Sequence, residues 1–262
     1  MKESINFNRA ATFYDATRKL RDDIADQITN ALLAEIRAAG ADRVLEVGIG
    51  TGRMARPLMR EGVQMVGVDI STEMMGQLFV QLTPEHTPPE LLLSDATALP
   101  FRDGTFRAAM VVHVLHLVQS VEDTVAEVRR VLAPGGVLLH QTRRPDEDTN
   151  RMWIEHDKFW IEVCRAHGHE LVQRPTQERI TQALTNSGAT ASVMELARSE
   201  DESSVEIELD NLRGRQHSWM WLIPDEIITD SMGEFEAWLR KRAAPDGTFM
   251  DRAAYVIEAW RW

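Results

Sequence analysis

The stretch that decides the fold is Arg43-Val44-Leu45-Glu46-Val47-Gly48-Ile49-Gly50-Thr51-Gly52. Residues 44–47 predict a buried β-strand, which runs directly into a loop with glycine at every second position. Glycine lets the backbone adopt positive φ and leaves no Cβ atom between the main chain and a ligand. A helix is predicted over residues 53–60, so its first N–H groups face whatever lies over the glycines. A strand, a glycine-rich turn and a helix N-terminus in this order are typical of the first nucleotide site of an open α/β sheet.

The spacing of the glycines separates two kinds of nucleotide site. The dinucleotide pattern Gly-x-Gly-x-x-Gly requires its third glycine at position 53, where this chain has Arg53, and the third glycine is Gly52 instead. An acidic residue, Glu46, stands two residues before the first glycine. In these features the stretch resembles the first motif, acid-x-Gly-x-Gly-x-Gly, of the class I S-adenosylmethionine (SAM) methyltransferases. Taken alone, the turn also fits a tight strand-to-helix connection that binds no ligand.

Length and composition place the chain among ordinary globular proteins. Its 262 residues, 44% hydrophobic and 27% charged, suit one large domain or one domain with an inserted subdomain. The formal net charge of -12 argues against a nucleic-acid partner, which needs clustered Lys and Arg. The single cysteine, Cys164, excludes an internal disulfide and favours the cytoplasm. We expect no signal peptide and no membrane span, because no apolar run is long enough.

A second acidic residue ends the next predicted strand. Residues 63–69 predict a buried strand that ends at Asp69, and Ser71 or Thr72 then caps a helix that runs to about residue 82. A carboxylate at this point is suited to accept hydrogen bonds from both hydroxyls of a ribose. Because the cap is supplied by other residues, we favour ribose binding for Asp69, with Ile70 and Met74 flanking the adenine.

A third acidic residue, Asp95, follows the predicted strand that begins at Leu91 and precedes the loop Ala-Thr-Ala-Leu-Pro-Phe. This segment closely resembles the adenine-recognition segment of the same family. The resemblance implies that Asp95 accepts a hydrogen bond from the adenine amine and that the Ala96 N–H meets a ring nitrogen. An ordinary Asx turn at Asp95 is the alternative.

Two histidines follow the fourth predicted strand, residues 106–112. His113 falls at the carboxyl end of that strand, where open sheets bind ligands. In the family this position lies beside the methionine part of SAM, and the next residues face the methyl acceptor. The segment is not Asn/Asp-Pro-Pro-Tyr/Phe, which disfavours methylation of adenine or glutamine amines. Our hypothesis is that His113 or His116 is a general base, because imidazole titrates near neutrality. The alternative is that they are buried histidines without a chemical role.

The remaining pattern completes an alternating α/β chain. An amphipathic helix is predicted over residues 120–132, and Pro134-Gly135-Gly136, which resembles the family's Leu-x-Pro-Gly-Gly motif, predicts a turn into a strand at 137–141. Further predictions are helices at 148–166 and 176–187, strands at 192–196 and 204–209, and a final antiparallel strand at 254–260. Residues 212–221 resemble the helix that precedes the last cap element of the family.

The N-terminal segment carries a weaker resemblance. Residues 7–15 are similar to the Phe…Ala…Tyr-Asp segment that lies over the active site in methyltransferases of the ubiquinone/menaquinone-biosynthesis type. The similarity implies that Tyr14 and Arg18 line the SAM or substrate pocket. Alternatively, Phe13 and Tyr14 pin the first helix, whose apolar residues recur from Leu20 to Leu32, to the sheet.

All seven tryptophans lie between residues 143 and 262. An aromatic cap of this kind could line an acceptor pocket, and Trp153, Trp219 and Trp221 are the candidates, with core packing as an equal alternative. For Trp260 and Trp262 we favour core packing. Cys164, His167 and His169 lie close in sequence but have no fourth partner at a recognisable spacing, so we expect no metal site.

The fold expected from these features is α/β, a doubly wound, mostly parallel seven-stranded sheet with a helical, Trp-rich cap insertion. We divide the chain into an N-terminal helical segment over the active site (1–40), a SAM-binding Rossmann-like core (41–142), and the cap insertion with the remaining strands (143–262). The predicted cofactor-binding residues are Tyr14, Arg18, Glu46, Gly48, Gly50, Gly52, Asp69, Ile70, Met74, Asp95, Ala96 and His113, and the predicted substrate pocket adds His116, Trp153, Trp219 and Trp221 to Tyr14.

The expected reaction transfers a methyl group from SAM to an oxygen, nitrogen or carbon of a small molecule and leaves S-adenosylhomocysteine (SAH). The protein would contribute positioning and a dry pocket, with a histidine base as an option. We expect a monomer or a homodimer. Two alternatives remain: an NAD(P)-dependent oxidoreductase, and a methyltransferase-like binding protein without catalysis.

Overall fold

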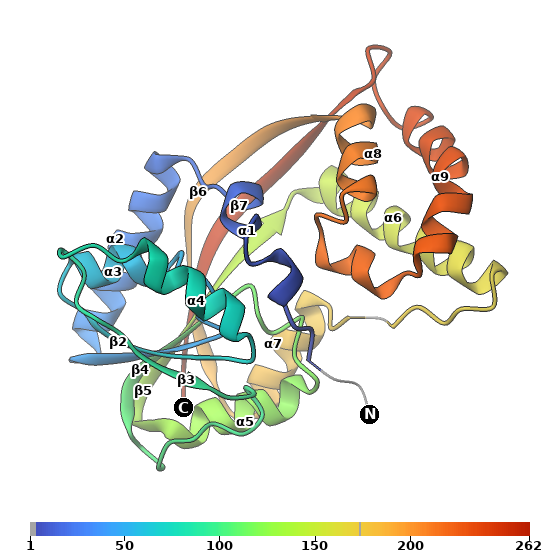
Figure 1. Cartoon of the computed structure of the whole chain (residues 1–262). Coiled ribbons are helices and arrows are strands. Elements are labelled where there is room, and N and C mark those ends of the chain that lie inside the picture. The colour runs from blue at the N-terminus through green and yellow to red at the C-terminus, as the bar shows by residue number, and fades with distance from the viewer. Residues whose placement is uncertain (1–3, 173) are drawn as a thin grey trace. The chain divides into compact units, whose positions relative to one another are not determined.

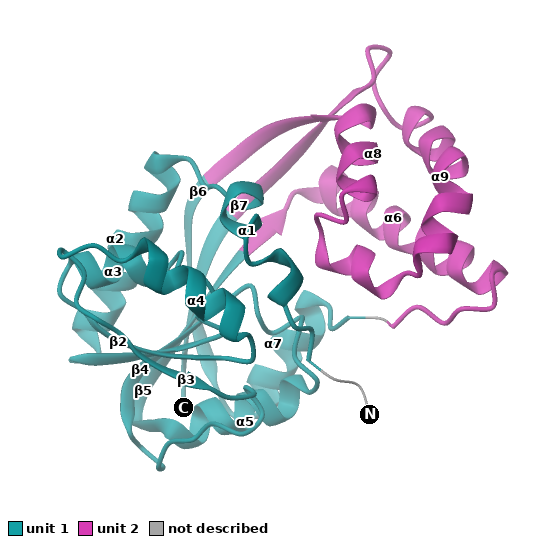
Figure 2. Ribbon diagram, in the orientation of Figure 1, with its two compact units in different colours: residues 1–142, 174–197, 255–262 teal, residues 143–173, 198–254 magenta. Residues whose placement is uncertain are grey.

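A computed structural model describes residues 4–172 and 174–262, and the chain folds into two compact units (Figure 1, Figure 2). Unit 1 contains the chain up to residue 142 together with residues 174–197 and 255–262, and unit 2 contains residues 143–173 and 198–254. No helix within the described ranges is long and apolar enough to cross a membrane.

Within the described residues the sheet has seven strands in the order β3-β2-β1-β4-β5-β7-β6. Their bounds are β1 Arg43–Val47, β2 Gln64–Asp69, β3 Glu90–Leu93, β4 Phe106–Val112, β5 Leu132–Pro145, β6 Thr190–Ser204 and β7 Thr248–Arg261. The first five strands pair in parallel, and β7 is antiparallel. The predicted seven-stranded, mostly parallel sheet is therefore confirmed.

The register of the central strands brings their carboxyl ends to one edge. Val47 of β1 lies opposite both Val68 of β2 and Val111 of β4. The chain therefore leaves all three strands at the same level. Gly48 follows Val47, Asp69 follows Val68, and Val112 follows Val111 and leads to His113.

Two apolar clusters cover the two faces of the sheet in unit 1. Helices α2 (Asp22–Ala38), α3 (Ala55–Arg60) and α4 (Thr72–Gln81) share one buried cluster with strand residues such as Val44 and Met110. Helices α5 (Val121–Val131) and α7 (Gln177–Asn186) share the other with Leu45 and Val111. Adjacent strand residues point to opposite faces, so strands that are buried on both sides need continuous apolar sequence.

Local signals set several element ends, and the cap predicted at Ser71 is confirmed. The Ser71 hydroxyl accepts a hydrogen bond from the Met74 N–H at 3.0 Å and caps α4, and Ser120 caps α5 in the same way. Helix α2 ends at Ala38, and the N–H of Ala41 then bonds the Ile36 carbonyl at 3.1 Å across Gly40. The short helices η1 (Asn8–Ala10) and α1 (Tyr14–Thr17) precede α2.

The turn predicted at residues 134–136 is wrong. These residues belong to β5, which begins at Leu132. The register with β4 shifts there, since Phe106 pairs with Leu132 but Ala108 pairs with Val137. The Pro-Gly-Gly sequence therefore forms an irregularity within the strand rather than a connection before it.

Unit 2 is helical and has its own aromatic core. It contains α6 (Glu147–Ala166), α8 (Val205–Arg213), η2 (Ser218–Leu222) and α9 (Asp225–Arg240), together with the ends of β5, β6 and β7 (Figure 2). Among the residues buried in this core are Phe159, Trp160 and Phe235. The strands predicted at 192–196 and 254–260 are parts of the longer β6 and β7, and α9 was not predicted.

The strand predicted over residues 204–209 is wrong, because the segment forms α8. Val205, Leu209 and Leu212 are buried at helical spacing, whereas Ile207 is 51% exposed. The Ser204 hydroxyl accepts a hydrogen bond from the Ile207 N–H at 3.2 Å and starts the helix. The helix expected at 212–221 is also wrong, since α8 ends at Arg213 and only the short η2 follows.

Candidate functional site

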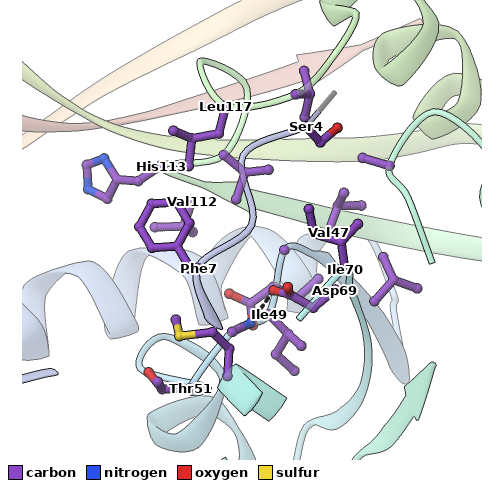
Figure 3. Close-up of a pocket in the computed structure, with 18 of the residues that line it drawn as sticks. Ser4, Phe7, Val47, Ile49, Thr51, Asp69, Ile70, Val112, His113 and Leu117 are labelled. Atoms are coloured by element: carbon purple, nitrogen blue, oxygen red, sulfur yellow. Dashed lines mark hydrogen bonds between the residues drawn. The ribbon is translucent and has the colours of Figure 1, made fainter. Parts of the chain in front are cut away.

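A cavity opens at the carboxyl edge of the strands in unit 1 (Figure 3). Its volume, including solvent at the mouth, is about 810 Å³. Residues after β1, β2 and β4 line it, together with part of the N-terminal segment. The predicted cofactor-binding residues that line it are Tyr14, Glu46, Gly48, Gly50, Asp69, Ile70, Met74, Ala96 and His113.

The glycine loop forms the floor of this pocket. Gly50 has φ +52°, and a Cβ atom there would stand 3.2 Å from Met74 Cε, so glycine keeps the main chain open to a ligand. Gly48 has φ +77°, and its Cβ would stand 2.3 Å from Val114 Cγ2. Gly52 does not line the pocket; it packs against Leu78 of α4.

Asp69 connects the end of β2 to the glycine loop. Its Oδ2 accepts a hydrogen bond from the Gly50 N–H at 2.8 Å (Figure 3). Its Oδ1 accepts one from the Ser71 N–H at 2.9 Å. Burial raises the pKa of this carboxyl group, while these backbone hydrogen bonds oppose the shift. Each carboxylate oxygen has a second lone pair, so Asp69 can still accept hydrogen bonds from two hydroxyls.

Glu46 lies on β1 beneath the pocket and is 2% exposed. Its Oε2 atom has no hydrogen-bond partner among the described residues. Burial raises the pKa of Glu46 to about 8, against the opposing charge of Arg53 and with a smaller contribution from Asp69. A buried oxygen without a partner is rare in native proteins, and here it can accept a hydrogen bond from a ligand that enters the pocket.

The N-terminal segment contributes residues to the pocket wall and bonds to two of the loops beside it. The Ile5 N–H donates to the Leu117 carbonyl at 3.0 Å, and the Asn6 side-chain amide donates to the Ile70 carbonyl at 3.2 Å. Phe7 and Tyr14 both line the pocket, with their rings edge to face at 5.8 Å. The segment therefore covers the apolar part of the cavity.

Both predicted catalytic histidines follow β4, but only His113 lines the pocket. His113 has φ +53° and lies on the opposite side of the pocket from Asp69 (Figure 3). Burial, and then the charges of Arg53 and two neighbouring histidines, hold the pKa of His113 well below its usual range. Burial lowers the pKa of His116 to about 3, and the positive charge of Arg174 is the next largest cause. Both imidazoles are neutral near pH 7, and so low a pKa disfavours His116 as a general base.

Residues 45–140 match the family model of a methyltransferase domain. This part of the chain is similar to a SAM-dependent methyltransferase domain. The chain is 31% identical over 140 residues to a demethylmenaquinone methyltransferase of Tropheryma whipplei, covering 51% of this chain and 55% of that protein. It is 30% identical over 140 residues to a malonyl-[acyl-carrier protein] O-methyltransferase of Enterobacter lignolyticus, covering 53% of each. The chain thus spans about half the length of these curated relatives.

The fold extends beyond the matched residues. The crystal structure of the YcgJ protein from Bacillus subtilis superposes with a TM-score of 0.55 at 19% identity, covering 90% of this chain and 99% of that one. At that identity the likeness concerns the fold alone. SAM is the cofactor that the matched family implies, and the unpartnered Glu46 oxygen and the open glycine loop of the pocket fit such a molecule.

Besides Gly52, two predicted cofactor-binding residues, Asp95 and Arg18, do not line the pocket. Asp95 Oδ1 accepts hydrogen bonds from the N–H and hydroxyl of Thr97 at 2.8 and 2.6 Å, which is the Asx-type turn held open as the alternative. Its Oδ2 accepts one from the Ser4 hydroxyl at 2.9 Å. Burial raises the pKa of Asp95, but these hydrogen bonds outweigh it and lower the pKa overall. Arg18 also lies off the pocket wall, and its carbonyl accepts a hydrogen bond from Arg53 at 3.1 Å.

The predicted tryptophans of the acceptor pocket belong to unit 2. Trp153 and Trp219 pack around the His156 ring with centroids 5.3 and 4.6 Å away, and the Trp221 indole donates to the Arg215 carbonyl at 2.7 Å. None of the three lines the pocket of unit 1. Across residues 4–172 and 174–262 no group of His, Cys, Asp and Glu side chains could hold a metal ion.

Sequence reasoning missed two polar residues at this end of the sheet. Arg53 was considered only as an interruption of the dinucleotide pattern, yet it lines the pocket. His140 on β5 is buried, and its Nδ1 lies 3.1 Å from Glu258 Oε2. A histidine inside the apolar run at 137–141 was the available signal, because a buried polar side chain needs a partner.

Proposed function

We propose that this protein transfers a methyl group from SAM to a small-molecule acceptor. The observation that carries the proposal is the pocket itself, in which the glycine floor, Asp69 and the orphaned Glu46 oxygen converge at the carboxyl edge of the sheet. The family match over residues 45–140 supports the same conclusion.

Each side chain would hold a different part of the cofactor. Asp69 would accept hydrogen bonds from the ribose hydroxyls, with Ile70 and Met74 against the adenine and the Ala96 N–H at a ring nitrogen. Glu46 would pair with the ammonium group of the methionine part, which accounts for its buried oxygen. That pairing requires Glu46 to ionise, so binding near neutral pH would release a proton from its carboxyl group.

Catalysis would rest on orientation and on the exclusion of water. The bound cofactor supplies a methyl group that is already activated for in-line attack. Phe7 and Tyr14 would exclude water from the cavity, and His113 would lie near the reacting end because it is opposite the ribose-binding Asp69 (Figure 3). The curated relatives are named for two different acceptors, so neither acceptor is assigned to this chain.

Isothermal titration calorimetry with SAM, SAH and NAD tests the proposal. We expect micromolar binding of SAM and SAH and none of NAD. Asp69→Ala and the milder Asp69→Asn should each weaken SAH binding about ten- to hundredfold, since hydrogen bonds to a charged group are lost. Asp103→Ala, at an exposed acidic residue in the turn before β4, is the matched control and should bind normally. A wild-type protein that binds neither SAM nor SAH would overturn the proposal.

A further inference from the structure

Arg53 is the one Lys or Arg side chain among the described residues that line the cofactor pocket. It follows the glycine loop directly, one residue after Gly52. Its Nη1 donates a hydrogen bond to the Arg18 carbonyl at 3.1 Å. A guanidinium group carries five N–H donors in a planar fork, so Arg53 can bind a further acceptor while it keeps this bond.

A pair of contacts at Asp15 fixes the segment against which Arg53 rests. Asp15 Oδ1 accepts a hydrogen bond from the Thr51 hydroxyl at 2.6 Å, and its Oδ2 accepts one from Arg56 at 3.0 Å. Asp15 thereby ties α1 to the glycine loop and to α3, three residues before the Arg18 carbonyl. Because this carbonyl is held near the loop, the Arg53 side chain is oriented before a ligand binds, which lowers the entropy cost of binding.

The charge of Arg53 reaches the side of the pocket that His113 lines. His113 lies opposite Asp69 in the pocket (Figure 3). After burial, the positive charge of Arg53 is the largest cause of the low pKa of His113, and it opposes the rise that burial causes in the pKa of Glu46. Burial raises the pKa of Asp69, and backbone hydrogen bonds rather than Arg53 oppose that rise. Arg53 therefore supplies positive charge away from the proposed ribose site.

The methionine part of SAM and SAH carries two opposite charges on one carbon atom, an ammonium group and a carboxylate. The unpartnered oxygen of Glu46 would serve the ammonium group. The carboxylate needs a cation, and Arg53 is the cation that the described pocket wall offers. A planar guanidinium fork can bond both oxygens of a carboxylate at once.

We propose that Arg53 binds the carboxylate of the methionine part of the cofactor, and that Arg53 and Glu46 together select a zwitterionic amino-acid group. This inference rests on the proposed function. The Arg18 carbonyl and Asp15 are positioning groups, since they hold the guanidinium at the pocket wall. A cofactor analogue that has the ammonium group but no carboxylate should keep the Glu46 contact and lose the Arg53 contact.

The test is calorimetric titration of SAH, and of decarboxylated SAH, which keeps the ammonium group, into the whole chain. The wild type should bind SAH about tenfold more tightly than the analogue, or better. Arg53→Gln should lose about tenfold in SAH affinity and bind the analogue at least as tightly as the wild type does, because a repelling charge is gone. Arg53→Lys keeps the charge without the fork and should lose less SAH affinity.

Two comparisons control for indirect effects. Arg60→Gln, at an exposed arginine in the last turn of α3, is the matched control and should bind both ligands as the wild type does. Glu46→Gln should weaken both ligands, because both carry the ammonium group. The pattern in which Arg53→Gln affects SAH alone therefore identifies the carboxylate as the group that Arg53 binds.

The outcomes separate this inference from the proposed function. If the wild type binds SAH and the analogue equally, the role of Arg53 is refuted and the methyltransferase proposal stands; this comparison needs no variant to fold. Equal weakening of both ligands in Arg53→Gln would also refute the inference, because the loss would then come from the structure of the pocket. If the wild type binds neither ligand, the proposed function falls, and the inference falls with it.

Discussion

Replacement of Glu46 by glutamine should stabilise the protein at alkaline pH while it weakens the cofactor site. The pKa of Glu46 is raised from 4.5 to about 8 by burial. Between these values the folded state binds more protons than the unfolded state, so stability falls as pH rises. The loss is about 1.4 kcal/mol per pH unit, or about 5 kcal/mol across the whole window. Glutamine has no proton to lose, so Glu46→Gln should escape this loss.

Urea unfolding of the wild type and the variant at about pH 5 and about pH 9 measures the effect as a difference, which cancels the titration of all other groups. The two proteins should be close in stability at the lower pH, and Glu46→Gln should be more stable by several kcal/mol at the higher pH. The control is Glu73→Gln, at an exposed residue of α4, which should show no pH-dependent difference.

The same variant should bind SAH about tenfold more weakly, because the charged partner of the ammonium group is gone. The reasoning is refuted if the stability difference between Glu46→Gln and the wild type is the same at both pH values. It is also refuted if the variant is the less stable protein at about pH 9.

Three further changes test the fold and the electrostatics. Gly48→Ala should lower the free energy of unfolding by about 1–3 kcal/mol through positive φ and contact with Val114, and Val114→Ala in the same chain should restore part of it in urea melts. Leu209→Ala should lower the free energy of unfolding by about 2–5 kcal/mol, because Leu209 is buried, whereas Ile207→Ala should lower it by under about 0.5 kcal/mol. Thermal or urea unfolding measures both changes, and similar values for the two variants would argue against α8. His116→Gln should leave stability unchanged above about pH 6.5 and raise it relative to the wild type as pH falls below that value, because the folded pKa is about 3; parallel pH curves in urea titrations would contradict this.

Local sequence was sufficient for the first half of the sheet. The segments around Glu46 and Asp69 combine apolar strands, a glycine turn and side-chain caps within about thirty residues, the length of one βαβ unit. Such units form by short-range rules, and their acidic residues reach the same edge of the sheet once the strands are parallel. The pocket residues contributed by these strands were predictable for that reason.

Helix α8 was not predictable from periodicity alone. The apolar residues Val205, Ile207 and Leu209 alternate as in a strand, whereas Val205, Leu209 and Leu212 follow a helical repeat. Both patterns share two residues, and the choice depends on which face is buried against the aromatic core of unit 2. Tertiary packing decided it by burying Leu212 and exposing Ile207.

The sequence by itself determined the order of strands and helices in the first half of the sheet, the glycine loop and the position of Glu46 and Asp69 at one pocket. Only the tertiary structure decided the electrostatics around His116, because the charged groups that lower its pKa, Arg174 and Arg18 among them, are far apart in the chain. A pKa is a property of that packing, since burial and neighbouring charges set it rather than residue type. The histidines therefore look like bases in the sequence and are weak ones in the fold.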